Sequence, residues 1–501
     1  MRKISVLLVI LFFLFCGTIF GAEGDVIWTR TYNGVANGEA RGQGIAVDEN
    51  GSVCVIGYQF VSGESYNIWV RKYDANGYEV WTSTYNGPGN AADMGEGIAV
   101  DGDGNVYVTG YEYHSLAEDY NIWIRKFNSN GEEVWTKTYN GASNDADCGY
   151  GIAVDGSGNV YVAGYETVPM QWGNIWVRKC DPDGEEIWTR THNGPINGTD
   201  RAHGIAVDES GNVYVTGYEN RGEPEDDIWV RKYNSNGEEV WTRTYNGADD
   251  QDDEGAGIAV DGMGNVYVVG SEYVSSEWYN IWVRKYDSDG EELWTRTHNG
   301  ALNTDDWGYA IAVDGSGNVF VTGLEVATAI ESDNIWVRKY DADGNVVWTK
   351  TYNGSANGSD EGRGIAVDES GNIYVTGFED VTGEGYNIWV RKYEGPFGAN
   401  FQPPEEGNVR IQGGEKGYVN PKKGEVAKIH FQPEGSGTVK VRIYTLRGQL
   451  VWEGSQSVSG YQDFIEWDCK NDENDVVASG IYVVYVEGPG IKATRKVAIL
   501  K

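Results

Sequence analysis

This 501-residue chain contains few of the residues that build metal, redox or disulfide-linked structures. It has 5 cysteines, 5 histidines and 4 methionines. No Cys-x-x-Cys pair or His/Cys cluster occurs, so the sequence offers no zinc motif. Four cysteines lie beyond the first 21 residues: Cys54, Cys148, Cys180 and Cys469. Three of them stand where otherwise similar segments carry other residues, so the cysteines predict no disulfide framework.

Positive charge is also scarce. The chain has 39 lysines and arginines against 76 aspartates and glutamates, a formal net charge of −37. A polyanion of this size repels nucleic acid and anionic membrane surfaces, so we expect neither as a partner. The same charge suits a soluble protein outside the cell.

Long apolar runs are missing except at the N-terminus. Arg2 and Lys3 precede an apolar segment over residues 4–15, and small residues follow at Gly21 and Ala22. This pattern is typical of a secretory signal peptide, here residues 1–21. The run is shorter than the roughly 20 residues of a membrane-spanning helix. The bulky residue before Cys16 disfavours lipidation there. We therefore expect a secreted or cell-surface protein whose mature chain has no transmembrane segment.

The most informative feature is an internal repeat. The block G-I-A-V-D, or A-I-A-V-D in one copy, recurs at intervals of 53 or 54 residues, starting at residues 44, 97, 151, 204, 257, 310 and 364. Each period contains four short runs rich in β-branched and aromatic residues, separated by Asp, Asn and Gly turns. No apolar period of 3.6 residues occurs, which argues against helices. Four antiparallel strands in each of seven repeats predict an all-β, seven-bladed β-propeller.

The phase of the repeat predicts how the ring closes. A lone fourth-type strand, residues 26–34, precedes the first block, and the last repeat ends at Tyr393 without one. We expect the N-terminal strand to complete the last blade, which removes an exposed edge.

The segments DGDGNVYVTGY (101–111) and KYDANGYEVW (72–81) recur around the predicted ring. With them, the chain resembles the bacterial family of seven-bladed β-propeller repeats over about residues 25–393. The resemblance implies a propeller in an extracellular setting and no single activity.

Nineteen tryptophans suggest a sugar-binding surface until their positions are considered. Fourteen recur in the third and fourth strands, mostly as W-x-R-x-Y, for example at Trp69, Arg71 and Tyr73. A period of two puts these three side chains on one face of the strand, where guanidinium groups can stack between rings. We interpret these tryptophans as packing between blades.

Variation concentrates in two sets of loops. The connections between strands two and three, and between strands four and one, are long, varied and acidic, and they should emerge on one face of the ring. Loops on a rigid scaffold commonly carry binding residues. The candidate ligand-binding residues on this face are aromatic or polar and outside the repeated pattern: Trp172, Trp278, Trp307, Tyr150, His203 and Tyr309, with Arg363 at the corresponding place in the last repeat.

Two repeated acids allow a metal hypothesis. An Asp lies four residues before the repeated block, and a Glu follows the second strand, in six blades; the first blade has Ala40 and Gln59 instead. We favour hydrogen bonds to loop N–H groups, while calcium would accept the same oxygens. No other cofactor is indicated. The candidate calcium ligands are Asp93, Glu112, Asp147, Glu166, Asp200, Glu219, Asp253, Glu272, Asp306, Glu325, Asp360 and Glu379.

The composition changes after the propeller. Residues 394–408 contain three prolines with glycines and predict a semi-rigid linker. Residues 409–501 alternate apolar and polar positions and predict a β-sandwich. The segment resembles the immunoglobulin-like domain of flagellar hook-cap (FlgD) proteins and related sorting modules. The resembling residues are Tyr444, Leu446, Arg447, Gly448, Trp467, Ala478, Ser479, Gly480, Tyr482 and residues 495–501. The resemblance implies a domain for attachment or sorting.

Together these features favour binding over catalysis. We predict a secreted or cell-surface scaffold, with a monomeric propeller, whose long-loop face contacts protein or glycan. The alternative is an extracellular polysaccharide hydrolase or lyase that uses carboxylates on the same face. No G-x-S-x-G or HExxH motif occurs, and no carboxylate pair stands out among so many.

Overall fold

The computed structural model describes residues 23–499, apart from 223–224, 327–331, 396–408, 413–418, 424–425, 432, 434, 446–448, 460–462 and 472–475. The predicted signal peptide, residues 1–21, and most of the predicted linker lie outside the described residues. The described residues contain strands and two three-residue 3₁₀ turns, η1 (Val35–Asn37) and η2 (Pro421–Lys423). No helix among them is long and apolar enough to cross a membrane.

Seven four-stranded antiparallel sheets confirm the predicted propeller. In six of the sheets the strands follow chain order from the innermost strand outward, and in the seventh the outermost strand is the N-terminal one. The first four blades consist of β2 (Ala40–Val47), β3 (Val53–Val61), β4 (Ser65–Tyr73) and β5 (Glu79–Tyr85); β6 (Met94–Val100), β7 (Val106–Ser115), β8 (Asp119–Phe127) and β9 (Glu133–Tyr139); β10 (Cys148–Val154), β11 (Val160–Val168), β12 (Trp172–Cys180) and β13 (Glu186–His192); and β14 (Arg201–Val207), β15 (Val213–Gly222), β16 (Glu225–Tyr233) and β17 (Glu239–Tyr245).

The remaining blades follow the same order. They consist of β18 (Glu254–Val260), β19 (Val266–Val274), β20 (Trp278–Tyr286) and β21 (Glu292–His298); β22 (Trp307–Val313), β23 (Val319–Val326), β24 (Asp333–Tyr340) and β25 (Val346–Tyr352); and β26 (Glu361–Val367), β27 (Ile373–Val381) and β28 (Gly385–Tyr393), completed by β1 (Val26–Tyr32).

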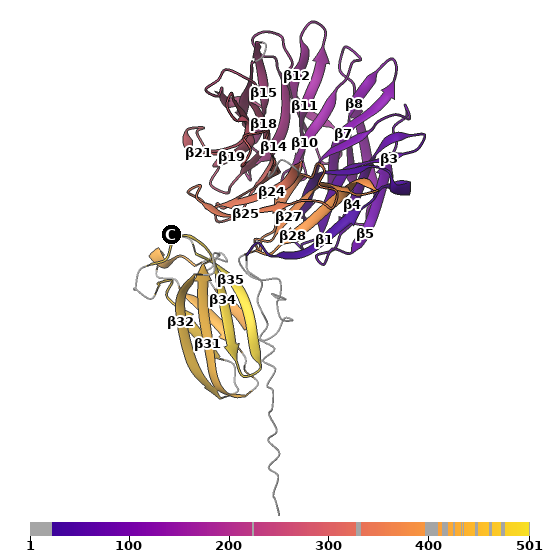
Figure 1. The fold of residues 1–501 in the computed structure, drawn as a ribbon. Coiled ribbons are helices and arrows are strands. Elements are labelled where there is room, and N and C mark those ends of the chain that lie inside the picture. Colours follow the sequence, from indigo (N-terminus) through magenta and orange to yellow (C-terminus); the bar gives the residue numbers. More distant parts are fainter. Residues whose placement is uncertain are drawn as a thin grey trace, which may run out of the picture.

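The N-terminal strand closes the ring as predicted. β1 pairs antiparallel with β28, from Val26 opposite Tyr393 to Tyr32 opposite Ile388. In Figure 1 the indigo β1 lies beside the orange β28, although the two strands are separated by almost the whole propeller sequence. Each innermost strand contacts the next one, and β26 contacts β2. The last blade is therefore built from both ends of the propeller segment.

The core of the propeller lies between its blades. Each of the seven blade interfaces has its own cluster of buried apolar residues. At the first interface, for example, Ile56 and Ile68 of one blade pack with Ile98 and Trp123 of the next. All seven third-strand tryptophans are fully buried. The assignment of the repeated tryptophans to blade packing is confirmed.

The repeated W-x-R-x-Y segments stack as expected. The Arg71 guanidinium lies 4.9 Å from the Trp69 ring and 4.5 Å from the Tyr32 ring of the preceding blade. The rings of Tyr32 and Trp69 are themselves stacked at 5.1 Å. The four described cysteines are buried and unpaired, in agreement with the absence of a disulfide framework.

The C-terminal strands form two sheets around one core. The first sheet has the order β29 (Val409–Gln412), β30 (Ala427–Phe431), β33 (Asp463–Trp467), and the second has the order β32 (Leu450–Ser459), β31 (Ser436–Thr445), β34 (Gly480–Gly488), β35 (Ile491–Ile499). Trp467, Ile443 and Val484 belong to the same buried cluster. The segment is therefore a β-sandwich, as its alternating pattern predicts.

Candidate functional site

The two faces of the propeller differ as the loops predict. The loops between strands four and one contact those between strands two and three: the Gly89 N–H donates to the Tyr113 carbonyl at 3.1 Å, and the Asp93 N–H to the Tyr66 carbonyl at 2.7 Å. These loops form the long-loop face. The opposite, short-turn face consists of tight turns such as the one at Asp208, whose carboxylate accepts hydrogen bonds from the N–H groups of Ser210 and Asn212, both at 2.9 Å.

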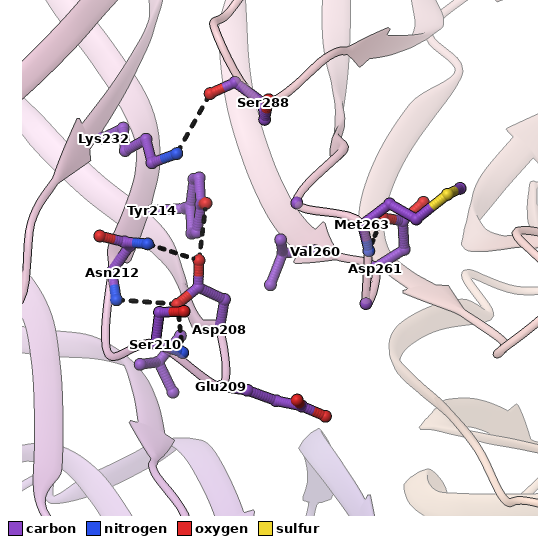
Figure 2. Close-up of a pocket in the computed structure, with 13 residues that line it drawn as sticks. Asp208, Glu209, Ser210, Asn212, Tyr214, Lys232, Val260, Asp261, Met263 and Ser288 are labelled. Atoms are coloured by element: carbon purple, nitrogen blue, oxygen red, sulfur yellow. Dashed lines mark hydrogen bonds between the residues drawn. The ribbon is translucent and has the colours of Figure 1, made fainter. Parts of the chain in front are cut away.

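A cavity of about 440 Å³ opens on the short-turn face between the fourth and fifth blades (Figure 2). Its polar groups already bind one another. The Tyr214 hydroxyl donates to Asp208 at 3.0 Å, and the Lys232 ammonium donates to the Ser288 carbonyl at 3.1 Å. Because the Tyr–Asp pair recurs in other blades, for example between Tyr267 and Asp261, we interpret this cavity as a crevice of the repeat.

The six repeated aspartates of the long-loop face cap loop N–H groups. Asp93 is fully buried and accepts from the Gly87 N–H at 2.5 Å and the Tyr113 N–H at 2.8 Å. Asp147, Asp200, Asp253, Asp306 and Asp360 each accept from the two corresponding N–H groups. Backbone hydrogen bonding, the favoured interpretation, is confirmed for these residues. Burial raises the pKa of Asp93 to about 6, against the opposing effect of the two donors.

The six repeated glutamates bind Tyr or His side chains of the preceding blade instead of the loop N–H groups favoured from the sequence, and so join neighbouring blades. Glu112 accepts a 2.5 Å hydrogen bond from the Tyr85 hydroxyl of the preceding blade. Where histidine replaces this tyrosine, the bond persists: His192 lies 2.5 Å from Glu219, and His298 lies 2.6 Å from Glu325. The other pairs are Tyr139–Glu166, Tyr245–Glu272 and Tyr352–Glu379.

The twelve candidate calcium ligands therefore all have protein hydrogen-bond partners. Within the described ranges, no group of three or more His, Cys, Asp or Glu side chains is arranged to hold a metal ion. The hydrogen bonds explain these acids without a cation, and calcium dependence remains a matter for experiment.

The residues near the propeller axis have a common structural origin. In all seven innermost strands the pairing register shifts at the residue just before the repeated block, which marks a β-bulge. A bulge re-aims one side chain out of the regular alternation. These seven residues, which we name the axial cluster, are Gln43, Glu96, Tyr150, His203, Ala256, Tyr309 and Arg363.

Close approach of the innermost strands brings the axial cluster together. A Cβ on Gly97 would lie only 2.5 Å from the Tyr150 carbonyl oxygen of the next blade, so this position needs glycine. The rings of Tyr150 and His203 meet edge to face at 5.2 Å. The Arg363 guanidinium lies 4.0 Å from the Tyr309 ring. The structure thus brings the sequence-predicted axial candidates into two contacting pairs.

The axial cluster is electrostatically unusual. Burial lowers the pKa of His203 to about 4, with a further contribution from Arg201, so the imidazole is neutral at pH 7. Burial raises the pKa of Glu96 to about 7, although Arg363 opposes the shift. The Nε atoms of Arg201 and Arg363 are buried and have no hydrogen-bond partner among the described residues. Perturbed groups of this kind concentrate at functional sites.

The three candidate tryptophans lie in two places. Trp172 and Trp278 are the first residues of β12 and β20, at the rim, where they are 72% and 56% exposed. Both have left-handed backbone conformations, with φ of 55° and 62°. Trp307 begins the innermost strand β22 and packs against Tyr279, with ring centroids 4.3 Å apart and the rings tilted by 31°. The structure does not place the three in one site.

The sequence analysis missed Glu96 and Glu254. Burial raises the pKa of Glu254 to about 7, and Asp226 and Asp252 add to the shift. The available signal was the residue before each repeated block, which differs from copy to copy while its neighbours repeat. Comparing the residue at this position in all seven repeats would have identified Glu96. Glu254 lies two residues before the equivalent position, Ala256, in its own blade.

The comparisons with known proteins agree with this architecture. Six segments match the family model described as "SBBP: Beta-propeller repeat", at residues 83–111, 134–165, 194–218, 240–271, 297–324 and 348–377. Each match spans a long loop and the first two strands of the following blade. The repeat matches and the ring of seven sheets identify this chain as a β-propeller protein. No curated protein sequence matches it.

Several solved structures are similar at low identity. PorZ, an essential surface component of the type-IX secretion system of Porphyromonas gingivalis, is 14% identical with a TM-score of 0.38, over 97% of this chain and 60% of PorZ. A protein from Dyadobacter fermentans is 8% identical (TM-score 0.44), over 74% of this chain and 98% of its own. The β-propeller domain of the Trilobed protease from Pyrococcus furiosus is 10% identical (TM-score 0.41), over 70% and 93%. This chain thus spans only about three fifths of PorZ.

Proposed function

We propose that this chain is a secreted or cell-surface binding protein that contacts a protein or glycan through the long-loop face of its propeller. The observation that carries the proposal is the axial cluster. Seven structurally equivalent bulges carry six kinds of side chain, including Glu96, His203 and Arg363. A repeat that is uniform at its packing positions has diversified at its axial positions, and this divergence supports a binding role for them.

Binding is favoured over catalysis because the axial groups are mixed. His203 and Tyr150 contact each other, while Arg363 binds Glu361 and stacks on Tyr309. Neutral imidazole, phenol, guanidinium and carboxyl groups together offer both donors and acceptors, which suits recognition of a polar ligand.

The test is a binding screen with a paired variant. The mature full chain and a Tyr150→Ala/His203→Ala double variant would be applied to a glycan array and to a panel of purified bacterial surface proteins. We expect at least one ligand whose binding falls tenfold or more in the double variant. The proposal would be contradicted if the chain bound neither the glycans nor the surface proteins, or if the double variant bound as well as the unmodified chain.

The C-terminal sandwich is proposed to attach or route the propeller. It resembles FlgD-like immunoglobulin domains at Trp467 and Tyr482, whose rings pack at 5.6 Å in its core. Cells expressing the full chain or a chain ending at residue 395 would be fractionated. If both forms distribute equally between cell surface and medium, the attachment role is wrong.

One observation favours a second candidate function, polysaccharide hydrolysis or lyase cleavage. A carboxyl group with a pKa near 7 can act as a general acid at neutral pH, and the Glu254 carboxyl, whose pKa burial raises to about 7, has Asp226 and Asp252 nearby. Release of reducing ends from polysaccharides, lost in Glu254→Gln, would support this alternative.

A further inference from the structure

A run of four contacting aromatic side chains on the long-loop face lies across the fifth and sixth blades. The Trp278 ring meets Tyr273 at 6.4 Å, Tyr273 meets Tyr279 at 5.4 Å, and Tyr279 meets Trp307 at 4.3 Å with the two rings tilted by 31°. We name these four residues the aromatic ladder. It runs from the exposed start of β20 to the start of the innermost strand β22 of the next blade.

Only the middle of the ladder belongs to the repeat. In the second blade, Tyr113 and Tyr120 meet in the same way at 5.4 Å. There Asp119 occupies the position of Trp278, and Cys148 of the following blade occupies that of Trp307. The two tryptophans therefore extend a repeated pair of rings at both ends.

The outer end of the ladder is unfavourable for folding. Trp278 is 56% exposed, and its φ of 62° lies in the left-handed region, which costs a non-glycine residue about 1–2 kcal/mol. A large apolar side chain that is both exposed and held in a strained backbone contributes little to stability. The left-handed conformation itself belongs to the turn, because it recurs at the equivalent residues Ser65 and Asp119. What distinguishes Trp278 is a large exposed ring in contact with Tyr273.

Carboxylates surround the inner end. Asp252, Glu254 and Asp305 lie close enough to raise the pKa of the Tyr279 hydroxyl, together with burial, which is the larger cause. Carboxylates accept hydrogen bonds from hydroxyl groups, and aromatic faces pack against the apolar C–H faces of sugar rings. A row of rings flanked by acceptors matches the two kinds of surface that a sugar chain presents.

Charge selects among the possible occupants. The chain carries a net charge of −37, and the acids beside Tyr279 add local negative potential. This field opposes uronate-rich or sulfated chains. The ladder is also a single row of rings, whereas a stable protein interface buries about 1,200–2,000 Å² in total around a broad core.

We propose that the aromatic ladder binds a neutral polysaccharide chain, with Trp278 and Trp307 as stacking platforms and the flanking carboxylates as acceptors for sugar hydroxyl groups. This inference rests on the proposed binding role of the long-loop face. It narrows that role to one ligand class and to one sector of the face.

The experiment uses the mature full chain and named probes. Affinity electrophoresis and calorimetry would measure binding to hydroxyethylcellulose, xyloglucan, glucomannan and dextran, with alginate and polygalacturonate as anionic probes. We expect at least one neutral polysaccharide to bind. Trp278→Ala and Trp307→Ala should each weaken that binding tenfold or more, while Trp307→Phe, which keeps an aromatic ring, should retain most of it.

Trp172→Ala is the matched control. Trp172 occupies the same strand position as Trp278 and is also exposed and left-handed, but Arg201 stands where the ladder would need a second tryptophan. Its replacement should change affinity by less than twofold. Unchanged melting temperatures would exclude misfolding as the cause of the losses.

Three results would overturn the inference: no neutral polysaccharide binds, only the anionic probes bind, or Trp278→Ala binds as well as the unmodified chain. If all sugars fail while a surface protein binds and is lost in the Tyr150→Ala/His203→Ala variant, the ladder inference is wrong and the broader binding role stands. If sugars and proteins both fail, both proposals are wrong.

Discussion

Every innermost strand of the propeller contains two neighbouring positions that behave in opposite ways. The isoleucine of the repeated block is the same residue in all seven blades and is at most 9% exposed in each, as at Ile98 and Ile205. Two residues earlier, the bulged position carries Glu96 in one of these blades and His203 in the other.

The difference shows what holds the repeat constant. The isoleucines fill the interfaces between blades, where a change of even one methylene group leaves a cavity or a clash. The bulged residues lie outside the repeated blade interfaces and contact one another near the axis, as Tyr150 and His203 do, so their size and chemistry can differ from blade to blade. Uniformity in this chain marks packing between blades, and the equivalent axial positions are where the repeat diverges.

The largest effect expected from this contrast is the loss of stability when a buried tryptophan is replaced. Trp69→Ala removes a fully buried ring from a blade interface and should destabilise the protein by about 3–5 kcal/mol. Trp172→Ala removes a ring that is 72% exposed and should change stability by about 0.5 kcal/mol or less. Denaturant unfolding of both variants measures the difference. Equal losses of stability in the two variants would mean that the exposed tryptophan packs as tightly as the buried one.

An effect of similar size is expected at the capping aspartates. Asp253→Ala leaves the Gly247 and Tyr273 N–H groups without their acceptor and should cost about 1–3 kcal/mol of stability for each unsatisfied group. Asp103→Ala, at an exposed turn position, serves as the control. Thermal unfolding followed by circular dichroism measures both.

Metal removal separates capping from calcium binding at the same residues. Because each aspartate already accepts hydrogen bonds from two N–H groups, EDTA should shift the melting temperature of the unmodified chain by less than about 1 °C. If a calcium site existed and free calcium were at 100 times its Kd, removing the calcium would cost about 2.7 kcal/mol of stability. A clear drop that added calcium restores would establish a calcium site.

The pH dependence should report the buried carboxyl groups of the long-loop face. The pKa values of Glu96 and Glu254 are raised to about 7 by burial, so the neutral forms are the stabilised ones. Their contribution is complete below the unfolded pKa near 4.5 and is lost as pH rises through 7. Glu96→Gln/Glu254→Gln should therefore match the unmodified chain at pH 4 and exceed its melting temperature at pH 8 by about 2 °C or more.

The control for this prediction is Glu209→Gln, at an exposed carboxylate of the short-turn face. Its melting temperature should follow that of the unmodified chain across the range. If the double variant shows the same pH slope as the unmodified chain, the two glutamates do not titrate near neutrality.

The smallest effect concerns backbone strain at the rim. Trp172→Gly relieves the left-handed conformation at φ 55° and should stabilise the protein by about 1 kcal/mol. The same change at Trp69, in an extended strand, should strongly destabilise it. A loss of stability at position 172 would mean that the exposed ring makes packing contacts that outweigh the strain.

The sequence by itself determined the architecture of the propeller, because strand period and turn chemistry are local properties repeated seven times. It predicted the clasp between β1 and β28 from the phase of the repeat, and it assigned the fourteen repeated tryptophans to packing. It also identified the long-loop face and the axial positions Tyr150, His203, Tyr309 and Arg363.

Only the tertiary structure decided how these residues meet. The bulges that aim the axial side chains are shifts of pairing between strands, and no spacing in one strand reveals them. The Asp93 carboxylate binds the N–H group of Gly87 in one loop and that of Tyr113 in strand β7, and the raised pKa values of Glu96 and Glu254 depend on burial that the ring creates. The contact of Tyr279 with Trp307 likewise joins two blades. The packing of adjacent blades brings these two residues together although they lie almost thirty positions apart in the sequence.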